Sequence, residues 1–244
     1  ASPRLVVDAA IDWEQGTDGA LQKIKLSTTT SFYSSVVPPV SGATIFVTNS
    51  NSTVFDFVES ETAGEYICTN FIPQIDETYT LTVIVNGQTY TATETLKSVA
   101  SITQIVQDNE GGITGDLIDI KAFFNDPADQ DNFYLFKYKY SNQAKLDYQV
   151  SDDRFFQGNT IFSLSNNEDL ATGDQIQITH YGISRTYYNY MNILLSIAGN
   201  TGGSPFQSPP ATVRGNIINN TNFDNYALGY FRLSETDSGS YTVQ

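Results

Sequence analysis

The sequence predicts an all-β protein with a single helix: an immunoglobulin-like β-sandwich followed by a second domain that resembles a β-sandwich or barrel. Three observations support this fold class. Apolar and polar residues alternate with a period of two in many short segments, and turn residues separate these segments. The 244 residues are also rich in strand formers, including 15 Tyr and 15 Phe.

The first hundred residues contain about seven short strand patterns, the number found in an immunoglobulin-like sandwich. Asn86-Gly87 is the strongest hairpin signal, because a type I′ turn requires positive φ at both central positions. Pro38 and Pro39 cannot donate backbone hydrogen bonds, so we expect them in a loop outside the sheet ladder. The expected strands lie near residues 5–11, 24–27, 43–48, 53–58, 64–68, 79–85 and 88–96.

We place a domain boundary at residues 97–100, which gives domains 1–98 and 99–244. The second domain shows strand patterns near residues 118–124, 133–140, 146–150, 176–180 and 227–233. Apolar residues at steps of three and four predict one amphipathic helix near residues 184–198. Ser184 can cap its start and Gly199 can end it, and we expect residues 199–210 to form a loop.

Charge and cysteine content exclude several classes of protein. The net charge of −15 opposes binding to nucleic acid or anionic lipid, while it could favour cations or neutral ligands. The single cysteine, Cys68, cannot form an intramolecular disulfide. No segment approaches the ~18 consecutive apolar residues of a membrane-spanning helix.

An acidic segment is the candidate metal site. Asp126, Asp129 and Asp131 could offer oxygen ligands to a hard cation. The segment lacks the glycine and the late glutamate of an EF-hand, and Asp-Pro commonly begins a turn. A solvated hairpin turn is therefore the favoured interpretation, and we expect no metal or cofactor.

The sequence shows no catalytic constellation. His180 is the only histidine, and a buried, hydrogen-bonded core residue is its favoured interpretation. Cys68 lies in a strand pattern, where a buried, inert thiol is the default. Asp152 and Asp153 are adjacent, so on a strand they would face opposite sides and could not form an acid–base pair. We therefore expect a protein that is not an enzyme.

The aromatic face of residues 133–140 is the best indication of a binding surface. Tyr134, Phe136, Tyr138 and Tyr140 share one face of the predicted strand, and such rings can stack on sugars or contact a protein partner. The favoured alternative is a sandwich core with the hydroxyl groups at its rim.

Several short segments, taken together in their order, resemble a family of Bacteroidota cell-envelope lipoproteins known as domain of unknown function 4249. The matching segments are Leu5-Val6-Val7-Asp8-Ala9, Lys25-Leu26-Ser27, Pro38-Pro39-Val40-Ser41-Gly42-Ala43-Thr44, Gly64-Glu65-Tyr66, Tyr79-Thr80-Leu81-Thr82-Val83, Tyr90-Thr91-Ala92-Thr93, Asp126-Pro127, Asn132-Phe133-Tyr134, Asp153-Arg154-Phe155-Phe156-Gln157-Gly158, Gly173-Asp174, Tyr188-Asn189-Tyr190, Pro209-Pro210-Ala211, Gly215-Asn216-Ile217 and Ala227-Leu228-Gly229-Tyr230-Phe231.

This resemblance implies an exported protein of the outer membrane, lipid-anchored through an N-terminal cysteine and partnered with a TonB-dependent outer-membrane transporter. No cysteine precedes Ala1 here, so we expect that a signal and anchor have been removed. The leading hypothesis is a non-enzymatic accessory lipoprotein of such a transporter. A surface adhesion or scaffold module is the alternative, and a carbohydrate-active hydrolase is the third hypothesis.

Overall fold

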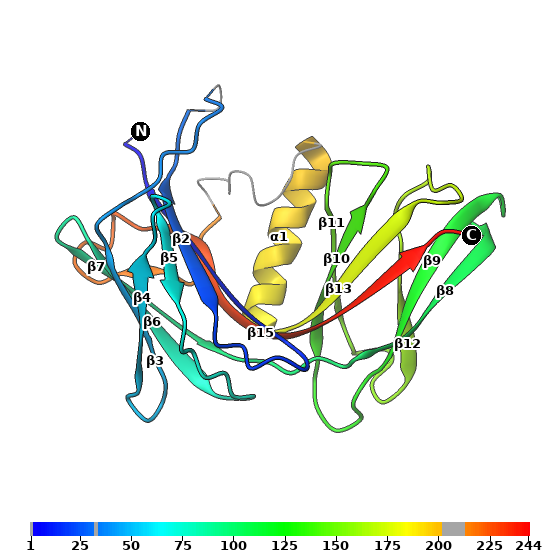
Figure 1. The fold of residues 1–244 in the computed structure, drawn as a ribbon, viewed down its shortest axis with the longest axis horizontal. Helices are drawn as coiled ribbons and strands as arrows, with labels where there is room; N and C mark the ends of the chain where they lie inside the picture. Colours follow the sequence, from blue (N-terminus) through cyan, green and yellow to red (C-terminus); the bar gives the residue numbers. More distant parts are fainter. Residues whose placement is uncertain (1, 32–33, 202–212) are drawn as a thin grey trace. The chain divides into compact units, whose positions relative to one another are not determined.

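The computed structural model describes residues 2–31, 34–201 and 213–244, and it consists mainly of β-sheet with one helix (Figure 1). The predicted fold class is therefore confirmed. The chain forms two compact units: Ala1–Lys97 with Ser196–Ser234, and Ser98–Leu195 with Glu235–Gln244. The expected loop at residues 199–210 lies largely outside the described residues.

Unit 1 is a β-sandwich whose strands alternate between a buried face and an exposed face. One sheet has the order β15-β1-β2-β5-β4, and β4 continues into a second sheet with the order β4-β3-β6-β7-β14. The core holds the inward residues of these strands, such as Val7, Leu81 and Val83. The strands are β1 (Leu5–Glu14), β2 (Gln22–Thr28), β3 (Thr44–Thr48), β4 (Val54–Glu59), β5 (Glu65–Cys68), β6 (Thr78–Val85), β7 (Gln88–Thr95), β14 (Ile218–Asn219) and β15 (Leu228–Thr242).

The segment 196–234 joins unit 1, so the structure divides the chain differently from the consecutive domains 1–98 and 99–244. β14 pairs with β7 through Ile218 and Thr91, and β15 is the neighbour of β1. Ile217, Phe231 and Leu233 belong to the core of unit 1. Burial of these apolar side chains explains why a late segment completes the first sandwich.

Unit 2 packs two antiparallel sheets around an aromatic core. The larger sheet has the order β11-β10-β13-β15, to which β15 contributes residues 235–242, and the smaller sheet has the order β12-β9-β8. The strands specific to this unit are β8 (Ile102–Gly111), β9 (Leu117–Asn125), β10 (Phe133–Tyr140), β11 (Asp147–Asp152), β12 (Thr160–Leu164) and β13 (Gln175–Ile183).

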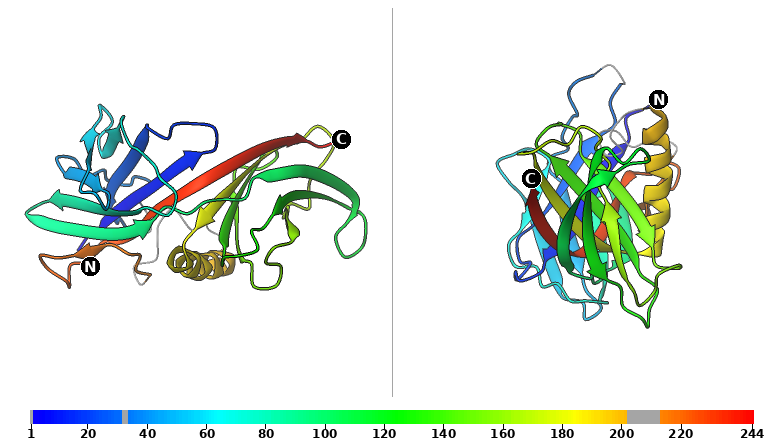
Figure 2. Two further views of the ribbon diagram at one scale, coloured as in Figure 1. Left: turned by 90° about the horizontal axis from the view of Figure 1, so that it is seen from below. Right: turned by 90° about the vertical axis from the view of Figure 1, so that its right-hand side faces the viewer.

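Helix α1 (Arg185–Thr201) runs along β10 and β13 (Figures 1 and 2). Ser184 caps its start, since the Ser184 Oγ accepts a hydrogen bond from the Tyr187 backbone N–H at 3.1 Å. Gly199 does not end the helix as expected, because it is not among the glycines with positive φ and α1 continues through it. The rings of Phe133 and Tyr188 lie 5.2 Å apart, so α1 covers the face of β10 that is opposite the aromatic core.

Candidate binding site in the loops of unit 2

The four aromatic residues proposed as a binding face lie in the core of unit 2. Tyr134 and Tyr138 are completely buried, and Phe136 and Tyr140 are each 2% exposed. The Tyr134 hydroxyl donates to Asp126 Oδ1 at 2.5 Å, and the Tyr138 hydroxyl donates to Ser163 Oγ at 2.7 Å. These rings therefore offer no surface to a ligand, and the structure places them as the core alternative requires.

The three carboxylates of the candidate metal site differ in burial and in the groups that they contact. Asp126 is buried, and its second oxygen accepts a hydrogen bond from the Gly158 backbone N–H at 3.1 Å. Asp129 is exposed, and the exposed Asp131 forms an ion pair with Arg185 at 3.5 Å. Within residues 2–31, 34–201 and 213–244, no group of three or more His, Cys, Asp or Glu side chains could hold a metal ion.

His180 is a neutral core residue that is completely buried. Its Nδ1 lies 2.9 Å from the carbonyl oxygen of Ala100, and its ring stacks on Phe136 at 4.0 Å. Burial lowers the pKa of His180 from 6.5 to about 3, so Nδ1 carries the proton that is donated to Ala100. Cys68 is buried in unit 1, and burial raises the pKa of its thiol.

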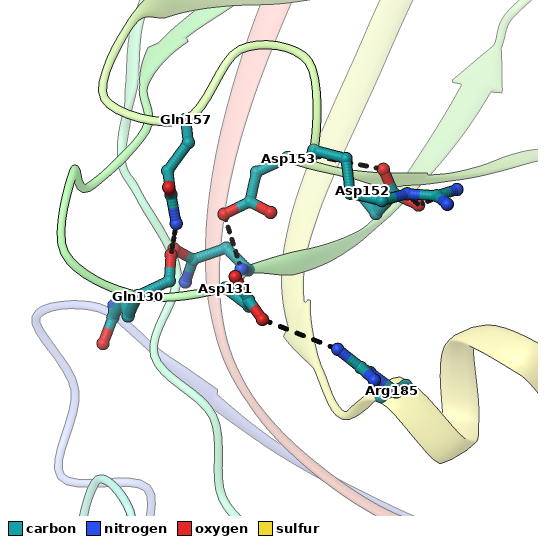
Figure 3. A network of polar contacts seen from close by, with 8 residues as sticks. Gln130, Asp131, Asp152, Asp153, Gln157 and Arg185 are labelled. Atoms are coloured by element: carbon teal, nitrogen blue, oxygen red, sulfur yellow. Dashed lines mark hydrogen bonds and ion pairs between the residues drawn. The ribbon is translucent and has the colours of Figure 1, made fainter.

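Two loops of unit 2 are joined by a network of hydrogen bonds (Figure 3). Asp153 Oδ2 accepts from the Asn132 backbone N–H at 2.7 Å, and the Asp153 backbone N–H donates to the Asn132 carbonyl at 3.2 Å. Gln157 Nε2 donates to the carbonyl of Gln130 at 2.8 Å. Together with the bond from Gly158 to Asp126, these contacts fix the turn at residues 153–158 against residues 126–132.

Asp152 and Asp153 have opposite electrostatic environments. Asp152 Oδ2 accepts a hydrogen bond from Arg154 Nε at 2.8 Å, and this bond lowers the pKa of Asp152. Asp153 is 2% exposed, and burial raises its pKa. The two neighbouring carboxylates thus engage different partners, Arg154 and the Asn132 backbone.

The clamped turn presents Phe155 to solvent. The Phe155 side chain is 91% exposed, whereas the adjacent Phe156 packs against the aromatic core. Arg154 lies beside Phe155, with its guanidinium carbon 5.9 Å from the ring centre. We call Arg154 and Phe155 the 154–155 tip. Its shape is set by hydrogen bonds on both sides of the turn, so it is a preorganised projection.

A small hollow of about 220 Å³ lies next to this network. Its lining includes no titratable side chain. Asn132, one of the lining residues, has a buried side-chain oxygen, Oδ1, without a hydrogen-bond partner among the described residues. The hollow is lined by Ser98, Val99, Ala100, Ser101, Thr103, Asn125, Pro127 and Asn132.

Phe155 and Asn132 were not predicted as site residues, although both lie in segments that carry the family resemblance. The signal for Phe155 was a pair of adjacent phenylalanines beside Gly158 in a turn, where only one of two neighbouring side chains can face a core. The role of Asn132 could not be predicted from the local sequence, because it depends on the contact with Asp153, which lies 21 residues away.

The family model described as "Domain of unknown function (DUF4249)" matches residues 1–240. The chain belongs to this family. The match covers both units of this DUF4249 chain, including the 154–155 tip. No curated protein matches the chain.

Solved structures similar to this DUF4249 chain contain fibronectin type III domains. A two-domain segment of chicken tenascin matches with 10% identity and a TM-score of 0.25, covering 75% of this chain and 91% of that chain. The FN1–FN3 domains of chicken CNTN1 match with 10% identity and a TM-score of 0.24, covering 74% of this chain and 59% of that chain. Within the described part of the chain, no helix combines the length and apolar character needed to span a membrane.

Proposed function

We propose that this DUF4249 chain is a non-catalytic binding protein of the bacterial outer membrane that assists a TonB-dependent transporter. In this proposal, a lipid on a cysteine that precedes Ala1 anchors the protein, and the 154–155 tip contacts the transporter. The geometry of the tip is the observation that carries the proposal.

The composition of the tip suits a protein interface. Aromatic residues and arginine are enriched among the residues that dominate binding energy, and Phe155 and Arg154 supply both types. Phe155 buries almost none of its ring in the free protein, so contact with a partner can remove most of this apolar surface from water.

The rigidity of the tip lowers the entropic cost of binding. Asp153, Gln157 and Gly158 are each hydrogen-bonded to the loop at residues 126–132. A turn that is already ordered loses little conformational freedom when a partner binds. A transporter surface with an apolar recess would complement Phe155, and Arg154, which is paired with Asp152, could donate its remaining N–H groups to an acceptor on the transporter.

Co-purification tests this proposal. The lipidated protein and the transporter encoded next to it are expressed together, and the transporter is isolated with a tag. We expect the natural protein to co-purify and the Phe155→Ala variant to be recovered much more weakly. Truncation of a central interface anchor costs about 2 kcal/mol or more, which weakens the affinity by more than about tenfold.

The matched control is Ile113→Ala. Ile113 is an exposed apolar residue of the same unit, in the turn between β8 and β9, and we expect its replacement to leave co-purification unchanged. Equal recovery of both variants would contradict the role of the tip. Failure of the natural protein to co-purify, together with binding to glycans in cells that lack the transporter, would favour the adhesion alternative.

A further inference from the structure

A second candidate site lies in unit 1, where two arginines contact one tyrosine ring. The guanidinium carbon of Arg4 lies 3.7 Å from the ring centre of Tyr226, and that of Arg214 lies 3.6 Å from the same centre. Two guanidinium groups this close to one centre cannot share a face without overlapping. They must therefore stack on opposite faces of Tyr226.

The guanidinium N–H groups of Arg4 and Arg214 have different surroundings. Arg4 Nη1 donates to the carbonyls of Asp224 and Tyr226 at 3.3 and 3.4 Å, which ties the first strand to this loop. Arg214 is exposed, and its contacts within the described residues are to the rings of Tyr226 and Phe223. Stacking occupies the faces of a guanidinium and leaves its in-plane N–H donors available.

Neither arginine is neutralised by a nearby carboxylate in the described part of the chain. The ion pairs found there, within 4.0 Å, involve other lysines and arginines. The two guanidinium groups therefore form a local positive region in a chain whose net charge is −15. They make this loop a local attractor for anions.

The backbone on both sides of the stack is fixed. Asn216 Nδ2 donates to the Phe231 carbonyl at 2.9 Å, and the Phe231 N–H donates to Asn216 Oδ1 at 2.8 Å. The buried Asn219 accepts the backbone N–H groups of Thr221 and Asn222 and so holds the loop that leads to Tyr226. These bonds hold the backbone that follows Arg214 and leads to Tyr226, and stacking on the Tyr226 ring orients the Arg214 guanidinium.

An exposed apolar side chain lies beside the in-plane N–H donors of Arg214, which have no hydrogen-bond partner among the described residues. Phe223 is 69% exposed and its ring centre is 6.0 Å from the Arg214 guanidinium carbon. A ligand that joins an anionic group to an apolar body could therefore use both, with the oxyanion on the Arg214 fork and the apolar part on Phe223.

We propose that Arg214, stacked on Tyr226 and supported by the charge of Arg4, binds the carboxylate or phosphate group of a small solute that also carries an apolar body. Arg214 donates two parallel hydrogen bonds to the oxyanion, and Phe223 contacts the apolar body. This site is separate from the 154–155 tip, and neither proposal depends on the other.

Titration of the full chain with phenyl phosphate tests this site. Calorimetry gives the affinity, and NMR follows the side-chain Nε–H signals of the arginines. We expect saturable binding at millimolar concentrations that weakens as salt increases, with inorganic phosphate binding more weakly and phenol not binding. Arg214→Ala should weaken binding at least about tenfold, and Arg214→Lys should also weaken it because lysine cannot donate a planar pair of hydrogen bonds.

Two further variants sharpen the test. Lys145→Ala removes an exposed cation of unit 2 and should leave the affinity unchanged. Asp224→Asn removes the negative charge of the residue whose carbonyl binds Arg4 and should strengthen binding. Thermal unfolding confirms that each variant is folded.

Equal affinity in the natural protein and Arg214→Ala, or no binding of phenyl phosphate up to its solubility limit, would overturn the proposal. Arg214-dependent sedimentation with vesicles of anionic phospholipid, without saturable binding of phenyl phosphate, would also contradict a small solute as the ligand.

Discussion

Removing the hydroxyl of Tyr134 should destabilise unit 2 more than removing the hydroxyl of Tyr138. Both side chains are completely buried and lie on the same face of β10, so Tyr→Phe deletes the same atom in a similar environment. The partners differ. Tyr134 donates to the carboxylate of Asp126, whereas Tyr138 donates to the hydroxyl of Ser163.

The expected magnitudes follow from these partners. A hydrogen bond to a charged group contributes about 1.5–3 kcal/mol to stability, and one between neutral groups about 0.5–1.5 kcal/mol. In Tyr134→Phe, the buried carboxylate of Asp126 loses the Tyr134 hydroxyl and keeps the hydrogen bond from the Gly158 backbone N–H at 3.1 Å. In Tyr138→Phe, Ser163 still donates to Gln149 at 2.9 Å. We therefore expect Tyr134→Phe to cost about 1–1.5 kcal/mol more than Tyr138→Phe.

Hydrogen exchange in increasing urea is the suitable assay, because the single tryptophan, Trp13, lies in unit 1 and does not report on unit 2. Exchange of the β10 and β13 amides gives the opening free energy of unit 2 directly. Trp13 fluorescence serves as the control and should show the same unit 1 transition in both variants. A cost for Tyr134→Phe that is equal to or below that for Tyr138→Phe would refute the assigned role of Asp126.

Two other predictions concern His180 and Gly229. Burial lowers the pKa of His180 from 6.5 to about 3, so between these pH values the unfolded chain binds a proton that the folded chain does not. The free energy of unfolding should therefore fall by up to ~1.4 kcal/mol per pH unit as the pH decreases from 6.5 towards 3. His180→Phe should remove that contribution, and an unchanged pH dependence of hydrogen exchange would contradict it. Gly229 has a φ of +92°, and a Cβ there would lie 2.0 Å from the Val7 carbonyl, so Gly229→Ala should prevent ordered packing of unit 1. Gly42→Ala is the control: Gly42 has a φ of +76° but no atom near the position of a Cβ, so this change should destabilise unit 1 by only about 1–2 kcal/mol. Similar Trp13 unfolding curves for Gly229→Ala and Gly42→Ala would argue against a close contact at Gly229.

Strands with one buried face were predictable because their side chains alternate. Tyr79, Leu81 and Val83 were expected to share a face, and all three are buried in the core of unit 1. The Asn86-Gly87 turn was also predicted and is confirmed: both residues have positive φ, and Val85 pairs with Gln88.

Strands at the edges of the smaller sheet of unit 2 could not be predicted. Among the residues that the structure describes, β8 and β12 are each paired with β9 alone, and many of their side chains are exposed or half-buried. Phe162 and Leu164 of β12 are 40% and 39% exposed. Without a consistently buried face, their residues carry no clear alternation.

The candidate sites depended on contacts between distant residues. The 154–155 tip is clamped through Asn132, 21 residues before Asp153 in the sequence. Arg4 reaches Tyr226 across 222 positions. Neither contact leaves a local pattern, so both required the folded chain to be recognised.

Site-specific photocrosslinking in cells tests the central claim most directly. A photoreactive phenylalanine analogue replaces Phe155 in the lipidated protein, and a matched variant carries it at the position of Ile113, which is also exposed. We predict a crosslink to the TonB-dependent transporter from position 155 that is absent from position 113. Crosslinks of equal strength from both positions, or none from position 155 in cells that contain the transporter, would contradict the proposed function.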